Sequence, residues 1–203
     1  MEILILFERE HELIERVAGA LFRWAERDGA DADAHRFASF LSVYATGFHH
    51  RREEEMLVPA LVGHLEVPAV RGPLQVVVDE HRRLELLEAR LAVGPDRESA
   101  RVLARTVWEH IDKENTVLFP EAGERLPRAG VAELPDRPMT PEERAARDLG
   151  ERLVEEYPPL EDPETIRGAG CIACSAFTVT CRGIEAEWWN DWEWEQHGRG
   201  DAD

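Results

Sequence analysis

One motif, His-x3-Glu-x2-apolar-Leu-apolar-Pro, occurs twice in this chain. The first copy spans His49–Pro59 and the second spans His110–Pro120. A Glu-His pair precedes each copy, Glu10-His11 before the first and Glu80-His81 before the second. A repeat of this kind fixes the architecture, because each unit is a piece of supersecondary structure. The chain up to Pro120 is therefore predicted to be a duplicated unit: a helix with one histidine, then a helix with a histidine and a glutamate.

Apolar residues at helical spacing predict four amphipathic helices joined by short loops. The first covers residues 2 to about 28, and the second begins near Asp31 and carries the first motif copy. The third covers residues 73–91, and the fourth runs from about residue 97 to 119. Pro59 is expected to perturb or kink the second helix. The predicted fold is all-α, an up-down-up-down four-helix bundle.

After the fourth helix the composition changes and predicts a C-terminal helical extension. Prolines and glycines from Gly123 onward predict a linker that wraps the bundle. Thr140 is a typical cap for a fifth helix, which should end before Pro158. We therefore expect a bundle over residues 1–125 and an extension over residues 126–203.

Net charge and cysteine content limit which partners and which cellular compartment we expect for this protein. The 203 residues carry a net charge of −18, which disfavours nucleic acid and anionic membrane surfaces because phosphate contacts need Lys and Arg. The opening apolar run, residues 3–7, is too short for a signal peptide or a membrane span. Three cysteines do not make a secreted disulfide framework, so we expect a cytoplasmic protein.

Each motif copy places a histidine and a glutamate one turn apart on the same helix face. A lone histidine on an apolar face is more often a core residue than a ligand, and acid-rich helices produce His-x3-Glu by chance, as at His11-Glu15 and His81-Glu85. The duplicated context nevertheless favours a metal site, since burying Glu53 and Glu114 without a cation would be expensive. Imidazole and carboxylate ligands without thiolate are typical of iron or manganese, with zinc an alternative.

Together these segments resemble the hemerythrin family, in its His-His-Glu cation-binding form. The resemblance covers residues 1 to about 125 and implies a bundle that holds an oxo- or hydroxo-bridged pair of irons. It also implies four terminal histidine ligands and two bridging glutamates, namely His11, His49, His81 and His110, with Glu53 and Glu114.

The sequence departs from the family pattern at Val77. Oxygen-carrying hemerythrins have a fifth histidine one turn before the position of His81, and valine cannot bind a metal. One iron should then have fewer protein ligands, with water, hydroxide or another side chain in the remaining position, for which Glu54 and Glu85 are candidates. An open position favours reaction with O2, peroxide or NO over reversible oxygen carriage.

Three further histidines, His35, His50 and His64, are expected at the surface. His50 should point about 100° away from His49, as adjacent residues of an α-helix do.

The cysteines and tryptophans of the extension lie beyond the resemblance. Cys171, Cys174 and Cys181 have three interpretations: a zinc site completed by a ligand such as His197, a redox pair, or small packed thiols. Four tryptophans between residues 188 and 194 predict a helix that covers the bundle or that forms an interface with a second copy or a partner protein.

The leading expectation is a non-haem di-iron protein that binds and reacts with O2, peroxide or NO, in stress handling or sensing. An alternative is an oxygen-activating oxidoreductase with a pocket for an organic substrate beside the irons. A third is a non-catalytic iron sensor whose fold depends on metal. Whether the protein is an enzyme stays open.

Overall fold

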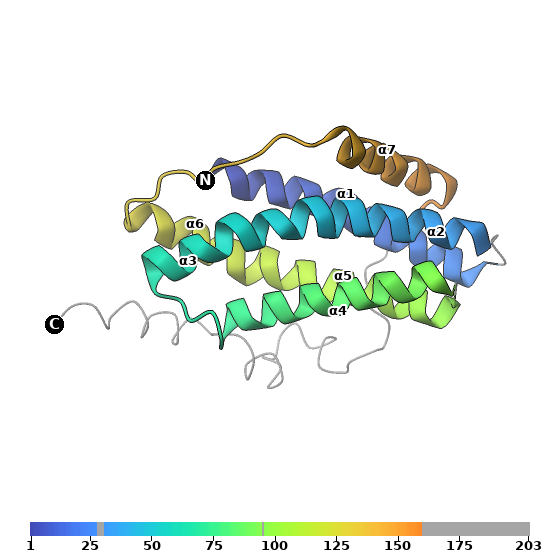
Figure 1. Ribbon diagram of the computed structural model, residues 1–203, viewed down its shortest axis with the longest axis horizontal. Helices are drawn as coiled ribbons and strands as arrows, with labels where there is room; N and C mark the ends of the chain where they lie inside the picture. Colours follow the sequence, from blue (N-terminus) through green and yellow to red (C-terminus); the bar gives the residue numbers. More distant parts are fainter. Residues whose placement is uncertain (28–30, 95, 160–203) are drawn as a thin grey trace.

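The computed structural model describes residues 1–27, 31–94 and 96–159, and every regular element in them is a helix (Figure 1). The all-α prediction is therefore confirmed. None of these helices is both long enough and apolar enough to cross a membrane. The predictions for the cysteines and the tryptophan-rich segment lie outside the described residues.

Four long helical segments run side by side and form the bundle (Figure 1). The first is α1 (Glu2–Glu26), and the third is α4 (Pro73–Val93). The second joins α2 (Asp31–Phe40), the π-helices η1 (Leu41–His50) and η2 (Glu53–Leu57), and α3 (Val58–Leu65). The fourth joins α5 (Arg97–Lys113), the π-helix η3 (Glu114–Leu118) and α6 (Phe119–Arg128). A further helix, α7 (Pro141–Glu156), packs against α1, α2 and η1.

Local signals in the sequence explain where several helices begin. Asp96 accepts hydrogen bonds from the backbone N–H groups of Glu98 and Ser99 and so caps α5. Thr140 and Glu143 form a reciprocal capping box at the start of α7. The predicted fifth helix is therefore confirmed.

Both motif copies end in a short π-helix followed at once by proline. The N–H of Val58 bonds to the carbonyl of Glu53, and the N–H of Phe119 bonds to the carbonyl of Glu114, five residues back in each case. Each proline then lies in the first turn of an α-helix, where its missing N–H is tolerated.

Two boundary predictions were therefore wrong. The fourth helical segment does not end at Phe119 but continues through Gly123 to Arg128, so the linker predicted from Gly123 begins later. The π-helical turn before each proline lets the helical segment continue beyond that proline. The predicted division of the chain at residue 125 stays a prediction.

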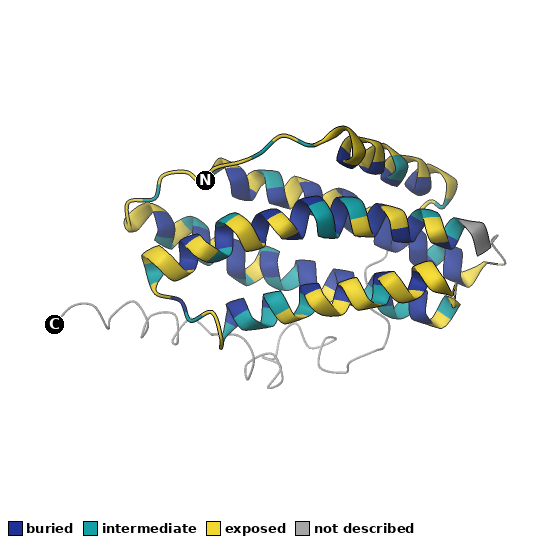
Figure 2. Cartoon of the chain, viewed as in Figure 1, coloured by how far each residue is buried: buried dark blue, intermediate teal, exposed yellow. Residues whose placement is uncertain are grey.

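The apolar interior has two clusters, separated along the bundle by a polar layer. The larger includes Leu13 and Leu84, and the smaller includes Phe7 and Val77. Figure 2 shows the buried faces of the helices turned toward one another. His11 lies between Phe7 and Leu13 in sequence, and His81 lies between Val77 and Leu84, so the histidines lie where one cluster gives way to the other.

Candidate metal centre

The histidines and glutamates of the two motif copies meet inside the bundle. The six residues predicted as ligands are each at most 1 % exposed. Together with His50, they supply ring nitrogens and carboxylate oxygens that fall into two groups, each with all ligand atoms within 4.8 Å of one another. One group is His11, His49, Glu53 and Glu114; the other is His50, Glu53, His81 and His110. Glu53 belongs to both groups, as expected of a carboxylate that bridges two ions.

The two glutamates each face both groups. Oε1 of Glu53 lies 3.2 Å from Nε2 of His49, and Oε2 lies 3.5 Å from Nε2 of His81. Oε2 of Glu114 lies 3.2 Å from Nε2 of His11, and Oε1 lies 3.7 Å from Nε2 of His81. All four carboxylate oxygens are buried without a hydrogen-bond partner in the described part of the chain. The imidazoles beside these oxygens can balance a buried carboxylate only when protonated, so a bound cation is the partner that leaves them free to act as ligands.

The ring nitrogens are spaced as neighbouring ligands on a metal would be. Nε2 of His11 lies 2.8 Å from Nε2 of His49, and Nε2 of His81 lies 3.1 Å from Nε2 of His110. With metal–nitrogen bonds of about 2 Å, two ligands at right angles are about 3 Å apart. The residues therefore fit a pair of metal ions.

Charge in the cluster favours the same conclusion. Burial lowers the pKa of His49, but the carboxylates of Glu53 and Glu10 outweigh burial and raise it to about 10. Burial raises the pKa of Glu114, but the neighbouring histidines, led by His110, hold it well below its usual range. The buried carboxylates thus stay ionised only beside positive charge. Metal ions can supply this charge while the histidines remain neutral, as metal binding requires.

A hydrogen-bonding group holds the outer nitrogen, Nδ1, of each predicted histidine ligand. Nδ1 of His11 lies 2.8 Å from Asn115, and Nδ1 of His49 lies 2.8 Å from Glu10. Nδ1 of His81 lies 2.8 Å from Glu54, and Nδ1 of His110 lies 3.1 Å from Glu80. Such outer contacts orient a histidine and raise its strength as a ligand. They direct Nε2 of each ring to the centre.

Sequence reasoning missed this outer layer, although the duplicated Glu-His pairs carried a signal for it. Glu10 precedes His11 on α1 but holds His49 on the neighbouring segment. In the same way Glu80 precedes a histidine on α4 but holds His110 on α5. In each unit, therefore, the glutamate of the Glu-His pair contacts the histidine on the other helix of that unit.

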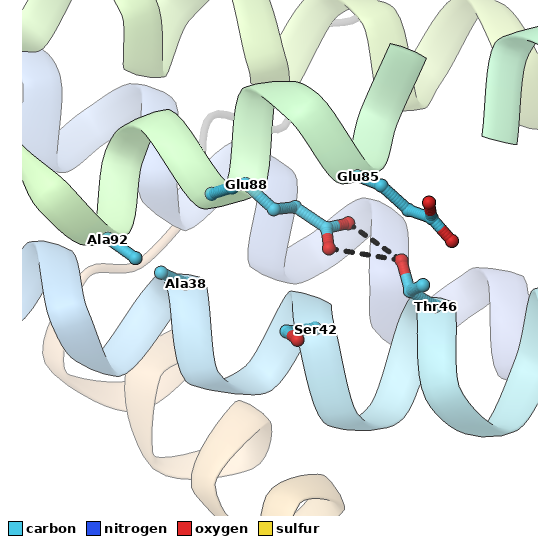
Figure 3. Close-up of a pocket in the computed structure, with 7 residues that line it drawn as sticks. Ala38, Ser42, Thr46, Glu85, Glu88 and Ala92 are labelled. Atoms are coloured by element: carbon cyan, nitrogen blue, oxygen red, sulfur yellow. Dashed lines mark hydrogen bonds between the residues drawn. The ribbon is translucent and has the colours of Figure 1, made fainter. Parts of the chain in front are cut away.

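Glu54 and Glu85, the candidates for an extra ligand, are in neither group of potential ligands. The Glu54 side chain is 42 % exposed and contacts the outer side of His81. Glu85 lines a cavity of about 320 Å³ together with Thr46 and Glu88 (Figure 3). None of the six main predicted ligands, the four histidines with Glu53 and Glu114, lines this cavity.

The surface prediction for His50 was wrong, whereas His35 and His64 are exposed as predicted. His50 is only 4 % exposed, and its ring stacks on His81 with centroids 4.2 Å apart. The prediction assumed an α-helix, but His50 ends the π-helix η1, in which each turn holds more residues. Adjacent side chains are then closer in direction, and both His49 and His50 face inward. Burial and the neighbouring histidines hold the pKa of His50 well below its usual range.

One family model matches this chain, over residues 3–122, and its description is hemerythrin HHE cation binding domain. The match includes both motif copies and every member of the two groups. Comparisons with curated proteins and with solved structures found no match. Over more than half of its length, therefore, the chain is a member of the hemerythrin family, in the HHE cation-binding form.

Proposed function

We propose that this bundle holds two iron ions, bridged by Glu53 and Glu114, and that the centre binds and reacts with O2, peroxide or NO. The observation that carries the proposal is the membership of Glu53 in both groups of buried ligand atoms. A carboxylate with one oxygen toward each group is suited to two ions rather than one.

The donor atoms favour iron over zinc. Each group offers imidazole nitrogens and carboxylate oxygens without thiolate, and carboxylate-bridged pairs in helical bundles are typical of iron and manganese. Structural zinc sites instead usually include cysteine thiolates among their ligands. The proposed zinc at the cysteines lies outside the described residues.

When bound, the irons would supply the electrons for reaction with a small oxidant or NO. The chain itself holds the ligands in place and keeps bulk water away. Phe119 stacks on His11 with centroids 5.3 Å apart, and Phe7 meets the edge of His49 at 5.5 Å. These rings close one side of the cluster with apolar surface and lower the local dielectric, so that charges there interact more strongly.

The cavity in Figure 3 gives no support to the alternative of an organic substrate, because none of the six main predicted ligands lines it. No described residue favours the alternative of a sensor that signals through the C-terminal segment. A small ligand that needs no pocket of its own fits the enclosed cluster better.

Optical spectroscopy of the iron-loaded protein tests the proposal. The spectrum would be recorded after anaerobic reduction and again after addition of air, peroxide or NO. We expect oxo-to-iron charge-transfer bands that vanish on reduction and return in air. Glu114→Ala should abolish these bands, whereas Glu109→Ala, at an exposed position five residues earlier, should leave them unchanged. A spectrum that no oxidant alters would contradict the proposed reactivity.

A further inference from the structure

We infer that His50 is a third imidazole ligand of the metal ion held by His81 and His110. It supplies from the second helical segment the nitrogen that Val77 cannot supply from α4. This inference rests on the proposed pair of metals, but the two can fail separately.

The position of His50 carries the inference. One of its ring nitrogens lies within 4.8 Å of the ligand atoms of Glu53, His81 and His110. Its ring stacks on His81 at a centroid distance of 4.2 Å and meets His110 edge-on at 5.2 Å. His50 is therefore as close to this part of the cluster as the predicted ligands are.

The hydrogen bonding of His50 sets it apart from an ordinary core histidine. Its Nδ1 atom is buried and has no hydrogen-bond partner in the described part of the chain. A buried polar nitrogen is normally satisfied, and an unsatisfied one needs an explanation. Each of the four histidines predicted as ligands has a partner on its Nδ1, namely Asn115, Glu10, Glu54 and Glu80. A metal ion is the partner that would satisfy His50.

The backbone explains how two consecutive residues reach one cluster. His49 belongs to the first group of ligand atoms and His50 to the second. Both lie at the end of η1, and π-turns inside helices occur frequently at functional sites. The wide turn thus lets one segment serve both metals.

The remaining candidates for the position are occupied otherwise. Val77 is completely buried in the smaller apolar cluster. Glu54 turns to the outer nitrogen of His81, and Glu85 lines the separate cavity (Figure 3). With His50 included, one metal has three imidazoles and the other, held by His11 and His49, has two.

His50→Phe tests this role, because phenylalanine keeps a planar buried ring but has no nitrogen. The protein would be loaded anaerobically with Fe(II), and in parallel with Co(II), whose visible spectrum reports coordination number. We expect His50→Phe to weaken binding of one of the two metals at least tenfold and to change the Co(II) spectrum. His64→Phe, at an exposed histidine of the same segment, should match the wild type.

Wild-type affinity and an unchanged Co(II) spectrum in His50→Phe would overturn the inference and leave the di-metal proposal standing. A wild-type protein that fails to bind two metals would instead overturn both. The unmodified protein offers a second measurement that needs no variant. Its Co(II) form should show hyperfine-shifted ring N–H signals from five histidines, His11, His49, His50, His81 and His110; signals from only four would contradict the assignment.

Discussion

Arg52 donates a hydrogen bond to the carboxylate of Glu10 over 2.5 Å, at a place where both side chains are buried. The other oxygen of Glu10 contacts Nδ1 of His49, and Arg52 also donates to Asp136. A continuous polar chain therefore leads from a predicted ligand to the segment between α6 and α7. The guanidinium lies over Phe7 and Phe48, and Arg52 is buried there.

Replacing Glu10 with glutamine should weaken metal binding. The change removes the negative charge that orients His49 and strengthens it as a ligand, and such outer contacts are worth roughly tenfold to hundredfold in affinity. Titration of the metal-free protein with Fe(II) would measure it. Glu12→Gln, at an exposed position of the same helix, is the control. Equal affinities for the two variants would show that Glu10 has no such role.

Replacing Arg52 with methionine should destabilise the metal-free protein by about 3 kcal/mol. Removing one partner of a buried ion pair costs roughly 3 to 5 kcal/mol, and the lower value applies because Glu10 keeps His49 as a partner. Denaturant unfolding would measure the loss, with Arg51→Met at an exposed neighbouring position as the control. A loss no larger than that of the control would mean that the buried pair contributes little.

Much of this centre follows from the spacing of residues in the sequence. The His-x3-Glu pairs and the Glu-His pairs predicted a helical bundle and a buried cluster, because residues four apart share a helix face. The four predicted histidines, Glu53 and Glu114 do come together in the interior. These inferences depend only on local geometry and on the energetic need to pair a buried charge.

The residues that were missed depend on departures from the α-helix. His50 was placed at the surface because α-helical spacing turns it away from His49, whereas η1 turns it inward. The helix beyond Phe119 was missed because the glycines and prolines from Gly123 onward were interpreted as a linker. Composition and spacing do not show which neighbour a carboxylate will contact. Glu54 was therefore considered as a metal ligand, whereas it contacts Nδ1 of His81.

Stability should fall as pH rises through the range in which Glu88 titrates. Burial raises the pKa of Glu88 to about 7, despite the hydrogen bonds from Thr46 that Figure 3 shows. The folded protein therefore holds this proton where the unfolded chain has released it, from the ordinary pKa of 4.5 up to about 7. Over that range the folded state should lose about 3 kcal/mol of stability relative to Glu88→Gln.

Unfolding of the wild type and of Glu88→Gln at pH 5 and pH 8 checks this prediction. The free energy of unfolding of the variant, relative to that of the wild type, should be higher at pH 8 than at pH 5, because glutamine does not ionise. Glu109→Gln, at an exposed position, should show no such gain. Parallel pH profiles for all three proteins would contradict the raised pKa.

The packing of α7 on the bundle can be tested at Gly150. A Cβ atom there would lie 2.3 Å from the ring of Phe40, so Gly150→Ala should destabilise by about 1 to 3 kcal/mol despite the better helix propensity of alanine. A Cβ atom at Gly63, in α3, would meet no neighbouring residue within 4 Å, and Gly63→Ala should stabilise by up to about 1 kcal/mol. Thermal unfolding of both variants would compare them. A stabilising Gly150→Ala would mean that α7 does not pack on Phe40 in this way.

The most direct test of the di-metal centre is a crystal of the iron-loaded protein, measured on both sides of the iron absorption edge. The resulting anomalous difference map should contain two peaks, one on each side of the Glu53 carboxylate, with Glu114 spanning the same pair. A single peak, or no peak at the cluster, would contradict the account.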